Sequence, residues 1–370
     1  MNWNFFYKFL SFCPPELAHD VAVKFLKYEF NSNLEVKYSP LTVSNLRFRN
    51  PIGLAAGFDK NAECINGISK IGFSHTEVGT ITINPQYGNS KPRVFRLNND
   101  EAIINRYGFN SKGIKKILEN LKKNSKKIVL GTNIGPNKNS TDKIKDYYLL
   151  SKLLSKYSDY LTVNISSPNT IGLRNFQYTK SLEEVIQAVN TGLKESGFIR
   201  PIFLKFSPDI KNKDLLESIN LACSCKINGF VLTNTTTSRP KTLLSRSKFQ
   251  EGGLSGKPIK YLASEKLFAV NKFLKESNIK DISLIGVGGI GNAEDVLMRI
   301  ILGADLVQIY TSLIYQGPNL IQKIMNKLDD FKKVERIQDF SEIKGTAKSV
   351  SDAEKRVNKI SNEIYKNNYI

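Results

Sequence analysis

The 370-residue sequence predicts an α/β fold, a (β/α)8 TIM barrel preceded by an N-terminal hairpin of two helices. Eight apolar, β-rich runs follow one another from residue 50 onward, and segments of helical periodicity separate them. Parallel strands buried on both faces read as continuous apolar runs, and a closed barrel requires eight strand–helix units. A doubly wound open sheet is the alternative, but it rarely contains so many regular units. The runs are residues 52–58, 73–82, 128–134, 160–165, 202–206, 230–235, 282–287 and 306–310.

The hairpin is predicted over residues 1–31. Aromatic residues crowd its first helix, a pair of prolines ends that helix, and the second helix covers residues 16–28. An apolar stripe along the second helix has two interpretations that the sequence leaves open. Either it packs on the main core, or the hairpin lies on a bilayer surface and opens an apolar tunnel, with its lysines near lipid phosphates. The stripe consists of Leu17, Val21, Phe25 and Tyr28.

The barrel domain is expected at residues 40–345. Residues 43–48, before its first unit, predict an added strand that closes the bottom of the barrel. Residues 346–370 form a polar tail, helical or frayed, for which the sequence indicates no role.

The composition narrows the class of partner. Lys and Arg total 54 against 34 Asp and Glu, and the resulting charge of +20 favours nucleic acid, anionic lipid or an anionic substrate. No compact basic block with interleaved aromatic residues stands out, so we expect solvated lysine-rich helix faces and no nucleic acid. Four cysteines and two histidines show no disulfide framework and no metal-ligand spacing, which predicts a reducing compartment and no metal. We also expect no membrane span, signal peptide or transit peptide.

Polar residues and glycines at the ends of the eight runs form the strongest functional pattern. The carboxyl ends of barrel strands meet at one face, where the chemistry of such barrels takes place. One polar strand end would mean little, but here the pattern recurs at all eight. The residues are Asp59 and Lys60, Gly79 and Thr80, Asn133, Asn164, Lys205, Thr233 to Thr235, Gly288 and Gly289, and Tyr310 and Thr311.

Three of these ends predict a bound flavin mononucleotide (FMN). The Ala-Ala-Gly turn at residues 55–57 lets the backbone lie flat against a planar ring. The glycine-rich turn at residues 286–291 precedes a helix, after the seventh strand, where barrels bind phosphate. Lys205 is unfavourable on a buried strand unless it meets negative charge, so we place it beside the flavin edge that becomes charged on reduction. The alternative is a lysine that extends to the rim.

Ser167 also has two interpretations. A serine before a proline is frequent in turns. No histidine lies near it in the sequence, since His19 and His75 are the only two. A serine can nevertheless accept a proton when a water or a polar neighbour relays it. The residues alone leave both interpretations open.

Seven stretches together resemble one family, the class 2 dihydroorotate dehydrogenases, which are membrane-associated, quinone-dependent flavoenzymes of pyrimidine biosynthesis. The resemblance extends from about residue 5 to about residue 345. The stretches are residues 50–60 (NPIGLAAGFDK), 91–97 (KPRVFRL), 104–110 (INRYGFN), 163–170 (VNISSPNT), 233–236 (TNTT), 251–258 (EGGLSGKP) and 286–289 (GVGG).

The resemblance implies oxidation of (S)-dihydroorotate to orotate, with one FMN per chain as hydride acceptor and a membrane quinone as final electron acceptor. Ser167 is implied as the base that removes the C5 proton while hydride leaves C6 for flavin N5; the soluble class has cysteine there. The implied substrate residues are Lys60, Asn105, Arg106, Tyr107, Gly108, Phe109, Asn164, Asn169, Asn234 and Thr235. The implied FMN residues are Ala56, Gly57, Lys60, Thr80, Asn133, Asn164, Lys205, Thr233, Gly256, Gly289, Tyr310 and Thr311. The implied quinone residues are His19, Arg96 and Tyr310.

The resemblance further implies that the hairpin contacts the bilayer and forms the quinone tunnel. We expect a bacterial monomer, peripheral to the cytoplasmic side of the inner membrane. Two alternatives remain. An FMN barrel acting on a nucleobase, such as a tRNA dihydrouridine synthase, would exploit the +20 charge but would need a cysteine acid and an RNA-binding domain, neither of which is visible. A non-catalytic basic protein that docks on membranes or nucleic acid would be colourless.

Overall fold

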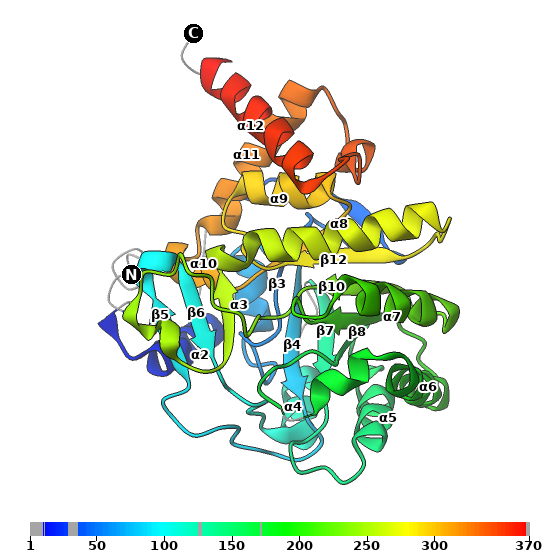
Figure 1. The fold of residues 1–370 in the computed structure, drawn as a ribbon. Coiled ribbons are helices and arrows are strands. Elements are labelled where there is room, and N and C mark those ends of the chain that lie inside the picture. The colour runs from blue at the N-terminus through cyan, green and yellow to red at the C-terminus, as the bar shows by residue number, and fades with distance from the viewer. Residues whose placement is uncertain (1–9, 11, 29–35, 125–127, 171, 368–370) are drawn as a thin grey trace.

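The computed structural model describes residues 10, 12–28, 36–124, 128–170 and 172–367. Its centre is a closed barrel of eight strands in the spatial order β10-β12-β13-β3-β4-β7-β8-β9, and all neighbouring pairs are parallel (Figure 1). The predicted barrel is therefore confirmed. The strands are β3 (Ile52–Leu54), β4 (His75–Ile81), β7 (Val129–Ile134), β8 (Tyr160–Asn164), β9 (Ile202–Phe206), β10 (Gly229–Leu232), β12 (Ser283–Val287) and β13 (Leu306–Ile309).

Each predicted run overlaps one of these strands, but five of the eight strands end before the run does. Run 52–58 forms a strand only as far as Leu54, and run 230–235 only as far as Leu232. The residues that follow are small or polar, and they leave the hydrogen-bonded ladder to face the barrel mouth. The residues at the barrel mouth thus begin where the hydrogen-bonded ladder of the barrel strands ends.

Helices follow the strands and cover the outside of the barrel (Figure 1). They are amphipathic, as α6 illustrates by burying Leu182, Val185 and Val189 on one face. The helices are α3 (Ile65–Lys70), α4 (Gly113–Lys122), α5 (Lys143–Leu154), α6 (Thr179–Ser196), α7 (Asn212–Ser224), α8 (Lys260–Glu276), α9 (Ala293–Ile301), α10 (Thr311–Gln316) and α11 (Leu320–Glu335).

A single strand was predicted over residues 43–48. The structure instead has two strands there, connected by a turn. β1 (Leu41–Val43) and β2 (Leu46–Phe48) pair antiparallel. Ser44 and Asn45 turn between them with positive φ angles of 48° and 62°, which ends the first strand. The expected position is correct, because Val43 and Phe48 pack with interior residues such as Phe203 at the bottom of the barrel.

A second, three-stranded antiparallel sheet was not predicted. It consists of β5 (Val94–Leu97), β6 (Ala102–Asn105) and β11 (Gly253–Gly256), in the order β11-β6-β5. The strands are short, and β11 lies about 150 residues from β6 in the chain, so no local pattern reveals their pairing. The sheet lies next to the N-terminal helix (Figure 1).

The second helix of the predicted hairpin is present as α2 (Pro15–Tyr28). The predicted first helix lies mostly outside the described residues, so the hairpin stays a prediction. The face of α2 that is buried contains Ala18 and Leu26, whereas Leu17 and Tyr28 are 52% and 72% exposed. The apolar stripe that was predicted from the sequence is therefore not the main buried face of α2. Glu16 fixes the helix by an ion pair to the buried Arg93, with 2.6 Å between Oε1 and Nη2.

The C-terminal tail is a helix rather than a frayed segment. This helix, α12 (Val350–Asn367), packs against α8, α9 and α11 (Figure 1). Its buried residues, Ala353, Val357, Ile360 and Ile364, recur at intervals of four and three, as an amphipathic helix requires.

We expect Ile360→Ala to lower the free energy of unfolding by about 2–5 kcal/mol, because it leaves a cavity under α12. Asn358→Ala, on the exposed face of the same helix, should change it by less than about 0.5 kcal/mol. Urea unfolding of both variants measures the difference. Equal midpoints would show that α12 does not pack as described.

Candidate active site

A cavity of about 970 Å³ lies at the carboxyl ends of the barrel strands and continues along α2. All the substrate, FMN and quinone residues expected from the sequence line it, except Arg106 and Asn133. The topology explains this convergence, because the carboxyl ends of eight parallel strands meet at one face. The lining divides into a polar part at the barrel mouth and an apolar part against α2.

Carboxamide side chains link the residues of the polar part to one another by hydrogen bonds. Asn164, the last residue of β8, donates to Thr80 Oγ1 at 2.9 Å, and its backbone oxygen accepts the Tyr147 hydroxyl at 2.8 Å. Asn169 Nδ2 donates to the backbone oxygen of Asn105 at 3.2 Å, which joins the loop after β8 to β6. These buried groups are hydrogen-bonded to one another, as burial requires.

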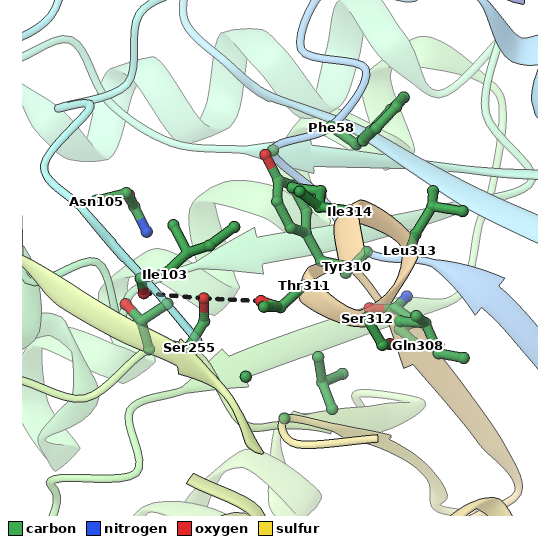
Figure 2. A pocket seen from close by; sticks show the side chains of 18 of the residues that line it. Phe58, Ile103, Asn105, Ser255, Gln308, Tyr310, Thr311, Ser312, Leu313 and Ile314 are labelled. Atoms are coloured by element: carbon green, nitrogen blue, oxygen red, sulfur yellow. Dashed lines mark hydrogen bonds between the residues drawn. The ribbon is translucent and has the colours of Figure 1, made fainter. Parts of the chain in front are cut away.

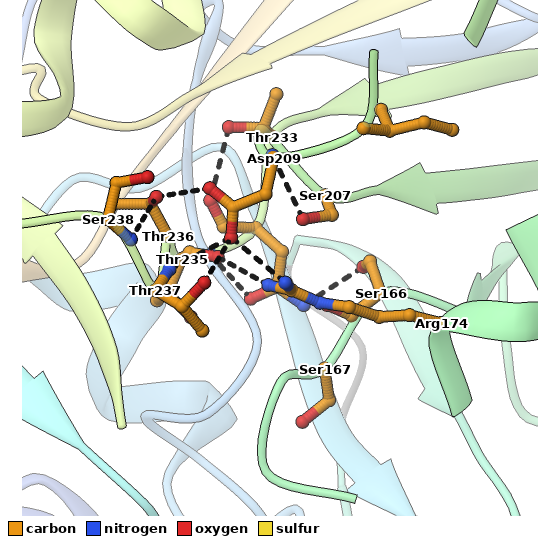
Figure 3. Close-up of polar contacts among 12 residues, drawn as sticks. Ser166, Ser167, Arg174, Ser207, Asp209, Thr233, Thr235, Thr236, Thr237 and Ser238 are labelled. Carbon is orange, nitrogen blue, oxygen red and sulfur yellow. Dashed lines mark hydrogen bonds and ion pairs between the residues drawn. The ribbon is translucent and has the colours of Figure 1, made fainter. Parts of the chain in front are cut away.

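An ion pair holds the loop that contains Ser167. Arg174 Nη1 lies 2.9 Å from Asp209 Oδ2, and the same guanidinium donates to the backbone oxygens of Ser166 and Thr235. Figure 3 shows Ser167 on this loop, with its hydroxyl pointing away from the Arg174–Asp209 cluster. Ser167 Oγ accepts the backbone N–H of Asn169 at 3.3 Å. The hydroxyl is thus aimed into the cavity from an anchored loop.

Lys60 faces α2 across the cavity. Its Nζ lies 3.3 Å from His19 Nε2 and 4.2 Å from the centre of the Tyr107 ring. Burial lowers the pKa of Lys60 from 10.5 to about 8, although nearby acidic groups such as Asp20 oppose the shift. Burial and the charge of Lys60 together lower the pKa of His19 well below its usual value. At neutral pH the lysine is therefore the proton donor and the imidazole the acceptor.

Lys205 is the second buried cation of the site. Its side chain is buried on β9, and burial lowers its pKa, an effect that the charge of Glu77 opposes. Within the described part of the chain it has no hydrogen-bond or ion-pair partner, yet it lines the cavity. An unpaired buried ammonium is unfavourable, so its place here favours a ligand with an electron-rich edge.

Two glycine turns bring the backbone itself to the cavity wall. Gly57 has φ of +100°, and a Cβ there would lie 3.6 Å from the Tyr310 ring. Gly289 has φ of +70°, and a Cβ there would lie 2.5 Å from Lys260 Cα. The Gly289 turn leads into α9, whose Asp295 is ion-paired with Lys260 at 2.5 Å. The first turn suits a planar ring and the second a phosphate group at a helix N-terminus.

The outer part of the cavity is apolar. Leu10, Ala18, Ala22 and Leu26 line it from the N-terminal segment, and Leu313 and Ile314 line it from α10. Aromatic rings separate it from the polar part: the centres of His19 and Phe58 are 5.2 Å apart, and those of Phe58 and Tyr310 are 6.0 Å apart. Figure 2 shows Tyr310 between Phe58 and the residues of β6 and β11. One cavity therefore holds two sites of different polarity in contact.

Comparison with known proteins agrees with this geometry. Residues 39–331 match the family model described as dihydroorotate dehydrogenase. The chain is 43% identical over 323 residues to the dihydroorotate dehydrogenase (quinone) of Bartonella tribocorum, which covers 85% of this chain and 88% of that protein. It is 41% identical to the enzyme of that name from Idiomarina loihiensis, over 85% of this chain and 96% of that one.

The chain belongs to the dihydroorotate dehydrogenase family. Its curated relatives are the quinone-dependent enzymes, so the class 2 resemblance is confirmed. The dihydroorotate dehydrogenase of Eimeria tenella has the same fold. Its structure in complex with ferulenol superposes with a TM-score of 0.85 at 35% identity, covering 90% of this chain and 95% of that one. The ligand-free form gives 0.84 at 34% identity, covering 90% and 99%.

Two residues that the dihydroorotate dehydrogenase resemblance implied do not line the cavity. Arg106 points outward: it donates to Gln250 Oε1 and to the backbone oxygen of Pro92, and it stacks over the Phe95 ring. Its side chain therefore braces the sheet that contains Asn105. Asn133 lies one layer below the cavity, where its Oδ1 accepts the Thr80 hydroxyl at 2.6 Å.

Sequence reasoning missed several residues of the dihydroorotate dehydrogenase site. Ser255 accepts the Thr311 hydroxyl at 2.9 Å on the cavity wall (Figure 2). Gln308 lines the cavity but sits inside run 306–310, where a polar residue on a buried strand was the available signal. Arg174 and Asp209 come from different loops, so only the folded chain brings them together. Among the residues that the structure describes, no cluster of His, Cys, Asp or Glu side chains could hold a metal ion.

Proposed function

We propose that this chain oxidises (S)-dihydroorotate to orotate in the barrel mouth, with FMN as the hydride acceptor and a membrane quinone as the final acceptor. Quinone-dependent dihydroorotate dehydrogenase activity in pyrimidine biosynthesis is the function of its family. The observation that carries the site assignment is the single cavity with a polar part around Ser167 and an apolar part along α2, separated by Phe58 and Tyr310.

The residues present fit FMN. The unpaired Lys205 supplies a cation for the flavin edge, the Gly57 turn admits a flat ring, and the Gly289 turn admits a phosphate. Ala56, Thr80, Asn164, Thr233, Gly256 and Thr311 complete the proposed FMN site, with Asn133 supporting it from below. The chemistry that bound FMN supplies is acceptance of the hydride that leaves C6 of dihydroorotate.

The substrate is proposed to lie between Lys60 and the loop of Ser167. The Lys60 ammonium binds its carboxylate, and Asn105, Asn169 and Asn234 bind the imide edge, because a carboxamide offers both a donor and an acceptor. Tyr107, Gly108, Phe109, Asn164 and Thr235 complete this proposed site. Ser167 Oγ accepts the C5 proton as hydride leaves C6 and passes its own hydroxyl proton to a water or a polar neighbour, while the Asn169 N–H donates to Oγ and holds it in place.

The quinone is proposed to enter along α2, with His19, Arg96 and Tyr310 near its head group. Phe12, Leu17 and Tyr28 are exposed on the N-terminal segment, together with Lys24 and Lys27, and this combination suits contact with an anionic bilayer surface. We propose that residues 1–31 form this membrane-contacting unit on a monomeric barrel, at the cytoplasmic side of a bacterial inner membrane. In the described part of the chain, no helix has both the length and the hydropathy that crossing a bilayer requires.

The proposal is tested by adding dihydroorotate to the purified protein without oxygen. Bound flavin should bleach, and a soluble quinone should restore the colour. A colourless preparation that takes up no FMN would contradict the proposal and favour a non-catalytic role.

Ser167→Ala should slow flavin reduction by dihydroorotate by about 10²- to 10⁴-fold, the usual contribution of a general base. FMN should stay bound, since the proposed flavin contacts lie elsewhere. Stopped-flow absorbance measures the rate, and the flavin spectrum provides the control. Reduction at the wild-type rate would exclude Ser167 as the base.

Binding of orotate should weaken above pH 8, because burial lowers the pKa of Lys60 to about 8 and the neutral amine no longer pairs with a carboxylate. The lowered pKa means that the attraction is complete well below pH 8, and the Kd rises by up to about tenfold per pH unit above it. Spectral titration from pH 6 to 9 measures the Kd. Lys60→Met should bind weakly at every pH and lose this dependence, and a wild-type Kd that stays constant would contradict the assignment.

Ala22→Trp should fill the apolar part of the cavity and slow turnover with quinone by at least about tenfold, because the indole would occupy the space beside α2 that the quinone needs. The rate of flavin reduction by dihydroorotate in the same variant is the internal control and should not change. If both rates stay at the wild-type value, quinone does not enter along α2.

A further inference from the structure

Glu77 is a carboxylate inside the barrel, below the cavity. It lies on β4 with no exposed surface. Its Oε1 accepts Gln308 Nε2 at 2.7 Å and Thr162 Oγ1 at 3.0 Å, and its Oε2 accepts Asn133 Nδ2 at 3.1 Å. The Tyr160 hydroxyl lies 3.5 Å from Oε1. A carboxylate only accepts hydrogen bonds, so it dictates that every neighbour turns a donor toward it.

This requirement also fixes the orientation of a series of carboxamides that extends from Glu77 to the cavity. Because Asn133 gives its Nδ2 to Glu77, its Oδ1 faces the cavity side and accepts Thr80 Oγ1 at 2.6 Å and Asn164 Nδ2 at 3.3 Å. Asn164 in turn has its Oδ1 on the opposite side, where it accepts the Ser166 backbone N–H at 3.2 Å. An amide has one donor end and one acceptor end, so fixing the first orients the next.

The series ends at the residues proposed to touch the substrate. Asn234 Nδ2 donates to Asn164 Oδ1 at 3.4 Å and to Ser166 Oγ at 3.0 Å, and its own Oδ1 accepts the Thr235 N–H at 2.8 Å. Thr80, Asn164 and Asn234 line the cavity, and Ser166 precedes Ser167. Glu77 and Asn133 are below the lining.

We propose that Glu77 is a positioning residue of the reaction, which sets the donor and acceptor directions of Asn133, Asn164 and Asn234 beneath the ligands. The proposal rests on the function proposed above. Glu77 touches neither substrate nor flavin and acts only through this series. Its charge also opposes the lowering of the Lys205 pKa that burial causes.

Glu77→Gln tests whether Glu77 sets the donor and acceptor directions of these carboxamides. The carbonyl of the introduced side chain can replace Oε1 toward Thr162 and Gln308, so its amide nitrogen must face Asn133 Nδ2, two donors in contact. Asn133 is then expected to reverse and to disorient Asn164. We expect the Kd for FMN to rise, and the rate constant for flavin reduction by dihydroorotate to fall, each by about 10- to 100-fold, the usual effect of a buried unsatisfied polar group.

Glu77→Gln combined with Asn133→Asp provides the rescue. The carboxylate introduced at position 133 can accept the new amide at position 77 with one oxygen and can accept Thr80 and Asn164 with the other, which restores the original direction and the single negative charge. Both values should return to within about threefold of wild type, whereas Asn133→Asp alone, which opposes two carboxylates, should be worse than either. Thr76→Val, a buried change on the same strand outside the series, is the matched control and should leave both values unchanged.

Wild-type values in Glu77→Gln, or a double variant as impaired as the two single variants together, would overturn the proposal. A lower thermal midpoint in Glu77→Gln with an unchanged Kd and rate would also overturn it, since it would show a purely structural role. The proposed function is judged separately, by wild-type flavin binding and bleaching. If wild type bound no flavin, the thermal midpoints of the apoproteins would still decide whether the double variant restores the hydrogen bonds.

Discussion

The structure depends on one constraint: a polar group buried inside a barrel costs free energy unless it finds a partner. A carboxamide at the end of a buried strand has a donor and an acceptor to satisfy. The chain meets this constraint by placing amides and hydroxyls at the ends of neighbouring strands, so that each completes the next. The polar mouth is therefore one connected unit, and its side chains cannot rotate independently.

The same constraint explains why the cavity divides sharply. Polar groups are confined to the strand ends and the loops tied to them, where Arg174 and Asp209 connect three segments. Beyond Phe58 and Tyr310 the wall is formed mainly by α2 and α10, whose inner faces are apolar. A hydride-transfer site and a site for a hydrophobic electron acceptor can thus lie in contact without mixing their polarity.

The sequence predicts the barrel well because its strands are local features. Each run can be recognised alone, and the carboxyl ends of the runs then indicate polar lining residues on most of the barrel strands, from Lys60 to Thr311. What it does not predict depends on contacts between distant segments. β6 and β11 pair across about 150 residues, and the Arg174–Asp209 ion pair joins two loops. Glu77 is missed although a charged residue inside run 73–82 is the same kind of signal as Lys205, because the sequence does not show which residues of other strands it contacts.

The position of α2 has a consequence for how the chain assembles during synthesis. α2 is translated before any part of the barrel, and its partners follow in stages: α3, whose Gly67 packs against Leu26, comes first, and Arg93, the partner of Glu16, comes just before β5. The α10 residues that complete the apolar wall of the cavity are made only when nearly the whole barrel has been translated. The apolar part of the cavity is therefore completed by α10 at the end of synthesis, although the helix that forms its other wall leaves the ribosome first.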